Sequence, residues 1–403
     1  MAYSTRYAFY EWSNWSLLLL LAWIIATEVA SDATRVLDRL LLLWGLGCGL
    51  YIFKTAVTYL SILKFGGQPH SAEFIIGFDN HRFFNHVQTV SLPLLGLLVL
   101  RSGQGGAWVG HTARYWWTLT AAWWMLLFVS SGRGTFLGIL AGVIMVLIWR
   151  RRQALPWCRV MLLSCIAGFG AYIVFYILVP HLIGLQPFGF LTEVVQRSVT
   201  NLDSSRWPLW LSAWEMIVSH PWLGVGPLHF AHYSRDVQIA AHPHNWVLQI
   251  ASEWGIPALF CLNTMLFMSL RKLLRTARSI AIDDLKNQAM LTVWLATGVA
   301  IVVDGFVSGL IVMPTSQLWI TLYIGCAWGW ASTFPDARRA KTNKLSAGVR
   351  IGLMAVVVLL IYFVMNGLFP EVLDLPSHNI KNLQDQIHPG ASLKPRLWGA
   401  GYF

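Results

Sequence analysis

The stretch IGLMAVVVLLIYFVM, residues 351–365, contains no charged side chain and forms the middle of an apolar segment at 349–369. A membrane-spanning helix needs about 20 predominantly apolar residues. Nine other segments of the 403-residue chain have this character, and 56% of all residues are hydrophobic while 12% are charged. The sequence therefore predicts an all-α polytopic membrane protein with about 10 (10–12) transmembrane helices. The expected spans are 14–30, 40–61, 84–100, 115–130, 134–149, 157–180, 246–270, 289–311, 318–333 and 349–369.

Lysine and arginine are unevenly distributed between the segments that connect these spans. Of the 29 Lys and Arg residues, 18 lie in one alternating set of connections: 31–39, 101–114, 150–159, 271–288 and 338–350. Cytoplasmic loops of membrane proteins are enriched in these two residues. We therefore expect this set to be cytoplasmic, and both termini to lie on the outer side. The net charge of +11 then reflects membrane topology and does not indicate nucleic-acid binding.

The expected spans divide the chain into four parts. Transmembrane helices occupy 1–180 and 246–369, a long outer loop occupies 181–245, and a short outer tail occupies 370–403. Apolar residues recur in the loop at three- and four-residue spacing, which predicts an amphipathic helix lying at the water–lipid interface. These residues are Trp207, Leu209, Trp210, Trp214, Ile217 and Val218. The following residues, Ser219 to Gly226, predict a helix end and a tight turn.

His244 and Asn245 end this loop, directly before the next apolar segment. A histidine has an ordinary pKa near ~6.5, so at neutral pH it is mostly a free base that can accept a proton. The positive end of the following helix would favour the neutral form. His244 is therefore a candidate general base, with His242 and Asn245 as supporting residues. The alternative is an interfacial histidine that only caps a helix.

Three outer arginines are candidate phosphate ligands. Arg133 lies between two glycines in a short hairpin turn, while Arg197 and Arg206 lie in the long loop. An arginine near the membrane is costly and often functional, and its planar fork binds phosphate through two hydrogen bonds. The alternative is that these side chains extend to lipid headgroups. The glycines beside Arg133 favour the binding role there, because they leave space for a large polar ligand.

Other chemistries are disfavoured by the residues. The histidine pairs His229/His232 and His242/His244 could supply zinc ligands, but no cysteine accompanies them. No phosphate-binding glycine loop, nucleotide motif or acidic metal pair is present, so we expect no metal and no cofactor. Lys54 and Asp304 lie inside expected spans and could line a polar cavity or form a structural pair.

Three motifs together resemble the O-antigen ligase and polymerase superfamily of bacterial inner-membrane glycosyltransferases. The first is His244-Asn245, nine residues, then Gly255; the family has Gly, Thr or Tyr three residues later, where this chain has Ala258. The second begins at Arg206 and ends in the Pro-x-x-Gly-x-Gly turn that contains Gly224 and Gly226. The third is the Ser-x-Arg-Gly hairpin around Arg133.

The resemblance implies a glycosyltransferase with its active site at the periplasmic face of the inner membrane. Such an enzyme moves a glycan from undecaprenyl pyrophosphate to an acceptor hydroxyl, with inversion and without nucleotide or metal. His244 would be the base, and Arg133, Arg206 and Arg197 would bind the pyrophosphate. The expected acceptor is lipid A–core, as in O-antigen ligases. A second lipid-linked glycan, as in polymerases, or pilin remain alternatives, as does a transporter of lipid-linked glycans that forms no bond.

Overall fold

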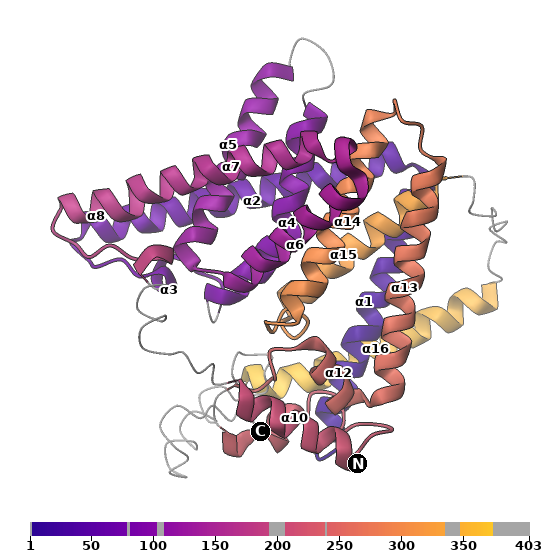
Figure 1. Cartoon of the computed structure of the whole chain (residues 1–403). Helices are drawn as coiled ribbons and strands as arrows, with labels where there is room; N and C mark the ends of the chain where they lie inside the picture. Colours follow the sequence, from indigo (N-terminus) through magenta and orange to yellow (C-terminus); the bar gives the residue numbers. More distant parts are fainter. Residues whose placement is uncertain are drawn as a thin grey trace. The chain divides into compact units, whose positions relative to one another are not determined.

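The computed structural model describes residues 2–78, 81–102, 109–192, 206–237, 240–334 and 347–373. Within these ranges every regular element is a helix, which confirms the predicted all-α class (Figure 1). The chain forms two compact units. The first consists of Met1–Ala30, Ser204–Lys272 and Gly305–Phe403, and the second of Ser31–Asp203 and Leu273–Asp304.

The helices of the two units follow from the apolar segments of the sequence. The second unit contains α2 (Ala33–Lys64), α3 (Ser71–Phe74), α4 (His81–Ser102), α5 (Val109–Ser130), α6 (Arg133–Arg150), α7 (Leu155–Tyr172), α8 (Val179–Leu182) and nearly all of α14 (Leu285–Gly305). The first unit contains nearly all of α1 (Thr5–Ser31), α10 (Trp207–Ser219), α11 (Phe230–Tyr233), α12 (Trp246–Trp254), most of α13 (Ile256–Ser279), α15 (Pro314–Ala331) and α16 (Ala347–Leu373).

Eight helices of the described residues are long and apolar enough to cross a membrane. They correspond to eight of the ten expected spans and include α1, α2, α4, α6, α13, α14 and α16, together with the continuous helix Leu155–Leu182. The two remaining expected spans, 115–130 and 318–333, fall mainly within helices α5 and α15, which are not among the eight. The chain is therefore a polytopic membrane protein, as predicted.

Small residues allow close helix packing in each unit. In the second unit, a Cβ atom at Gly138 or Gly142 of α6 would lie 2.6 or 2.5 Å from the carbonyl oxygens of Ala300 and Ala296 on α14. In the first unit, Gly325 and Gly329 of α15 lie in the same way against α1. Glycines four residues apart let helix backbones approach closely in membranes, where van der Waals packing holds helices together.

The expected span 246–270 is divided into two helices. The short helix α12 ends at Trp254, and α13 begins at Ile256. Between them Gly255 has a φ of +86°, a left-handed conformation that ends the first helix. Pro257 then occupies the first turn of α13, where its missing N–H does not interrupt a helical hydrogen bond. The predicted span was wrong in its start, because hydropathy does not detect a helix end inside an apolar segment.

Candidate functional site

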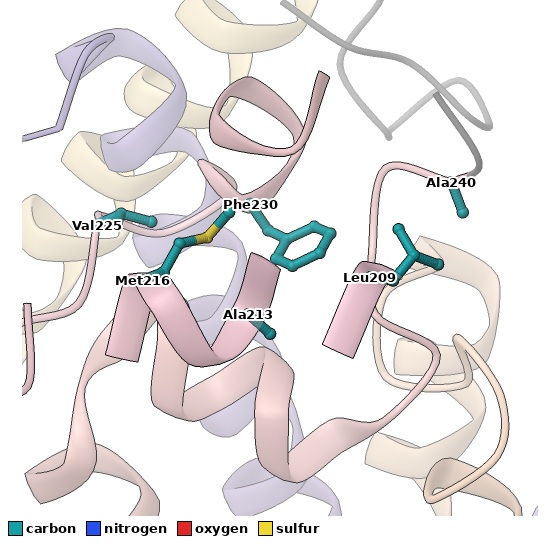
Figure 2. Close-up of a cluster of buried hydrophobic side chains, with 6 residues drawn as sticks. All are labelled: Leu209, Ala213, Met216, Val225, Phe230 and Ala240. Carbon is teal, nitrogen blue, oxygen red and sulfur yellow. The ribbon is translucent and has the colours of Figure 1, made fainter. Parts of the chain in front are cut away.

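Helix α10 forms where the spacing of the apolar residues predicts a helix, but these residues do not share one face. Leu209 and Ile217 are buried, whereas Trp207, Trp214 and Val218 are exposed. The inner face of the helix packs against the chain that follows it, forming a small core in the first unit (Figure 2). The exposed fractions of Leu209 and Ala213 are both 0%. The six residues of this core are Leu209, Ala213, Met216, Val225, Phe230 and Ala240. The described part of the long loop after residue 206 is thus folded and can hold side chains in fixed positions.

The opposite face of α10 is apolar but exposed. Trp207, Leu211, Trp214 and Val218 recur along it at helical spacing. Trp222 and Leu223, in the turn after the helix, are exposed as well. Exposed tryptophans and aliphatic residues on one side of a helix are typical of an interfacial membrane helix. We call the four helical residues Trp207, Leu211, Trp214 and Val218 the exposed stripe.

Two of the motifs identified in the sequence are in direct contact. Val225 N–H donates to the Ser252 carbonyl over 2.8 Å, and Ile256 N–H donates to the Pro221 carbonyl over 2.9 Å. A Cβ atom at Gly224 would lie 2.3 Å from the carbonyl carbon of Glu253, and one at Gly255 would lie 2.3 Å from the Trp222 oxygen. Only glycine fits at these two positions, because the backbones of the two motifs lie too close together for a Cβ atom.

The third glycine of these motifs, Gly226, has a φ of +112°. Its N–H donates to the Glu253 carbonyl over 3.1 Å. The Glu253 carboxylate in turn accepts the Phe230 N–H over 2.9 Å. The Pro-x-x-Gly-x-Gly turn is thereby fixed to the end of α12, nine residues beyond Asn245.

Asn245, not His244, is the residue that caps α12. Its side-chain oxygen accepts the N–H groups of Val247 and Leu248, at 2.9 and 3.2 Å. Its side-chain amide donates to the Phe306 carbonyl. Asparagine is among the best residues for this position, because its side chain satisfies backbone donors that the first turn leaves open. The alternative role for His244, a simple helix cap, is therefore already filled by its neighbour.

His244 is half-buried and has a φ of +53°. This left-handed conformation is uncommon for residues other than glycine, and strained residues of this kind cluster at functional sites. The His244 Nδ1 atom lies 3.1 Å from Nε2 of His242, whose exposed fraction is 3%. The structure therefore brings together the two histidines that the sequence places on either side of Pro243.

Arg206 directly precedes α10, in the same unit as His244. Its carbonyl accepts the N–H of Trp210, one helical turn further along. The indole N–H of Trp210 donates to the Pro243 carbonyl over 2.9 Å. Since residues four apart share a helix face, Arg206 begins the face of α10 that carries this contact with the histidine turn.

Arg133 begins α6 in the second unit, where its side chain is exposed. The turn before it includes Ser131, with a φ of +56°, and presses Gly132 against Asn85 of α4. The Asn85 side-chain amide donates to the Ser130 hydroxyl. An arginine in the first turn of a helix adds its charge to the positive end of the helix dipole, which favours anion binding.

Asp304 lies beneath this turn, at the end of α14. It is buried and accepts a hydrogen bond from the Thr89 hydroxyl of α4. The Thr135 hydroxyl of α6 donates to the Asn85 carbonyl over 2.8 Å. Lys54, the other ionisable residue expected inside a span, donates to the Ile76 carbonyl. Asp304 and Lys54 therefore form hydrogen bonds with different partners within the second unit.

The remaining sequence candidates have different positions. Arg197 lies outside the described residues. His229 Nδ1 donates to the Pro227 carbonyl over 2.7 Å, so its Nε2 accepts the backbone N–H of Ser4 over 2.8 Å. His232 stacks on Tyr3 with ring centroids 3.9 Å apart. In the part of the chain that the structure describes, no group of three His, Cys, Asp or Glu side chains could hold a metal ion.

Some contacts of the site could not be found from the sequence. Gly309 lies against the His242 ring: a Cβ atom added there would be 2.3 Å from Nε2. The sequence shows that Trp210 lies in a helix, but it does not show the hydrogen bond of Trp210 to Pro243. Both contacts depend on residues far apart in the chain, and a glycine in a loop carries no signal of what it faces.

Residues 118–262 match the family model described as O-antigen ligase. This range contains Arg133, Arg206, His244 and both glycine motifs. The match confirms the predicted resemblance and supports assignment of this chain to the O-antigen ligase superfamily. Its members have the glycosyltransferase-like function of O-antigen ligases and polymerases. No curated protein matches the chain in the comparison made.

Proposed function

We propose that the protein transfers a glycan from undecaprenyl pyrophosphate to the hydroxyl of an acceptor at the periplasmic face of the bacterial inner membrane. The acceptor that we propose is lipid A–core, so that the reaction completes lipopolysaccharide. The observation that carries the proposal is the hydrogen bond from Trp210 to Pro243, which fixes the His242–His244 turn to the helix that Arg206 opens.

In the proposed reaction His244 removes the proton of the acceptor hydroxyl. The oxygen attacks the anomeric carbon of the glycan, the bond from this carbon to the pyrophosphate oxygen breaks, and its electron pair leaves with undecaprenyl pyrophosphate. Attack opposite the leaving group inverts the anomeric centre. A positioned base of this kind contributes about 10²–10⁴-fold to the rate.

The leaving pyrophosphate needs stabilisation of negative charge more than it needs a proton. A guanidinium supplies this charge permanently and binds phosphate oxygens in pairs. We propose that Arg206 has this role. The sequence predicts the same role for Arg133, which lies in the Ser-x-Arg-Gly motif, and for Arg197, which lies in the long loop.

The test uses purified protein in detergent with an undecaprenyl-pyrophosphate-linked glycan as donor. Release of undecaprenyl pyrophosphate only when lipid A–core is added supports the ligase. Release with a second molecule of donor and no lipid A–core would instead identify a polymerase, and release with pilin a protein-modifying enzyme. Binding of the donor without release of undecaprenyl pyrophosphate under any of these conditions would favour the transporter and contradict the proposal.

The His244→Asn variant tests whether His244 is the general base. Asparagine tolerates the left-handed conformation that His244 adopts, so this variant should fold. Its amide cannot accept a proton at neutral pH. We expect transfer to fall by about 10²–10⁴-fold with unchanged donor binding. Transfer near the wild-type rate would remove His244 from the mechanism.

A further inference from the structure

We propose that His242 is a positioning residue, whose imidazole accepts a hydrogen bond from His244 and thereby holds the base in its reactive tautomer. This inference rests on the proposed function of His244. The two rings lie nearly edge to face, with centroids 4.2 Å apart and planes inclined by 63°. The 3.1 Å separation of His242 Nε2 from His244 Nδ1 is hydrogen-bonding distance.

Only one of the two possible arrangements of the shared proton suits a base. If His242 donates, the Nδ1 atom of His244 accepts through its lone pair. The proton of His244 is then on its own Nε2, which cannot act as a base. If His244 donates, its Nε2 carries the lone pair that takes the proton of the acceptor hydroxyl. The nitrogen opposite the reactive one determines the tautomer of a histidine through the hydrogen bond that it makes. His242 as acceptor therefore prepares His244 for proton transfer.

The burial of the two rings distinguishes the base from its support. His242 is 3% exposed and is flanked by buried Ala241 and Pro243. His244 is half-buried, so it is the ring of the pair with the greater access for a substrate. A buried residue in contact with a reacting residue acts through it and not on the substrate.

The surroundings of His242 hold its ring in place. Its Nε2 side lies against Gly309, where a Cβ atom would approach to 2.3 Å. The next carbonyl along the chain, that of Pro243, accepts the Trp210 indole N–H. A side chain at position 309 would therefore push the ring away from His244, and Gly309 leaves the space that the pair needs.

The test compares His242→Gln with His242→Asn. The glutamine amide reaches about as far as Nε2 and can accept from His244 Nδ1, whereas the asparagine amide is one methylene shorter. We expect His242→Gln to keep nearly the wild-type kcat. We expect His242→Asn to lower kcat by about 10-fold, the value of one hydrogen bond, with KM for the donor unchanged. Equal kcat values for both variants would overturn the proposal. His220→Asn, in the same loop at an exposed position, serves as the control.

Gly309→Ala provides a second test that leaves both histidines in the chain. We expect the same loss of kcat at unchanged donor KM, because the added methyl group displaces the His242 ring. Gly352→Ala is the matched control, since a Cβ atom there meets nothing within 4 Å. A Gly309→Ala variant that folds and turns over at the wild-type rate would show that the position of His242 does not matter.

Double substitution separates this proposal from the proposed function. In a His244→Asn background, His242→Asn should have no additional effect, because the residue that it positions is gone. Additive losses would show that His242 acts independently and would overturn the inference. If His244→Asn itself retains full transfer, the proposed base is wrong, and this outcome is distinct from a failure of His242 alone.

Discussion

The indole N–H of Trp210 donates to the carbonyl oxygen of Pro243 over 2.9 Å, joining the first turn of α10 to the turn between His242 and His244. Trp210 is partly buried, while Trp214, one turn further along, is on the exposed side of the helix. The same helix therefore contacts the turn beside the candidate base through one tryptophan and leaves another exposed.

Trp210→Phe removes this hydrogen bond but keeps most of the aromatic ring. The bond contributes about 1 kcal/mol, so we expect the rate of transfer to fall by roughly fivefold through misplacement of His244. Trp214 is 58% exposed, so Trp214→Phe should leave the rate within experimental error. Steady-state assays with both variants make the comparison, and an equal response would show that the bond has no role in turnover.

Arginine-to-lysine substitutions test the pyrophosphate ligands. Arg206→Lys and Arg133→Lys should each reduce turnover, because a point charge cannot replace a planar fork that binds two oxygens. Donor affinity should fall further in the alanine variants. Arg235→Lys, at an exposed position of the same loop as Arg206, provides a control. Titration of the lipid-linked donor against each variant gives the result, and unchanged affinity in both alanine variants would place the phosphates elsewhere.

Gly224→Ala should destabilise the protein through two separate effects. The left-handed backbone costs about 1–2 kcal/mol for a residue with a Cβ atom, and that atom would also collide with the Glu253 carbonyl group. Gly66→Ala separates the effects, since Gly66 has a similar φ of +70° but nothing within 4 Å of an added Cβ atom. Thermal unfolding in detergent should show a larger loss for Gly224→Ala. Equal losses would mean that the contact between the two motifs is not tight.

Removal of divalent metal should leave transfer unchanged. The proposed chemistry uses arginine charge in place of a Lewis acid, and His229 already uses both ring nitrogens in hydrogen bonds to Ser4 and Pro227. Enzyme treated with a chelator and then dialysed should match untreated enzyme. Loss of activity that zinc or magnesium restores would contradict the metal-free mechanism.

Membrane topology is tested with single cysteines at Ser219 and Ser279, which are both exposed at helix ends. The distribution of Lys and Arg predicts that position 219 lies outside and that position 279 lies in a cytoplasmic loop. In a background without the five native cysteines, an impermeant thiol reagent on spheroplasts should label position 219 alone. Labelling of position 279 alone would put His244 on the wrong side of the membrane for a periplasmic substrate.

The fold class follows from the sequence because a bilayer requires long apolar helices, and hydropathy detects these directly. Helix α10 is also predictable, since its apolar residues recur at helical spacing, but the sequence does not show which of them are buried and which are exposed. The division at Gly255 was not predicted, although Gly255 and Pro257 carry the signals of a helix end and a helix start. Because apolar residues continue on both sides of Gly255 and Pro257, hydropathy alone gives one uninterrupted span.

The candidate site is partly predictable. The His244-Asn245 pair stands out by its place between a polar loop and an apolar segment, but the helix cap belongs to Asn245. The contact of His242 with Gly309 could not be predicted, because it joins a loop to another segment far along the chain. Packing of this kind depends on the three-dimensional path of the backbone, for which a single sequence provides no pairing information.

The exposed stripe of α10 has a consequence for the position of such an enzyme in membranes of different thickness. A helix that rests at the headgroup level keeps its depth when the hydrocarbon core becomes thicker or thinner, whereas a spanning helix must tilt. Since Trp210 joins Pro243 to α10, His244 would stay at a constant height beside the phosphate layer. Changes in acyl-chain length would then be absorbed by α13, with Gly255 as the joint between them.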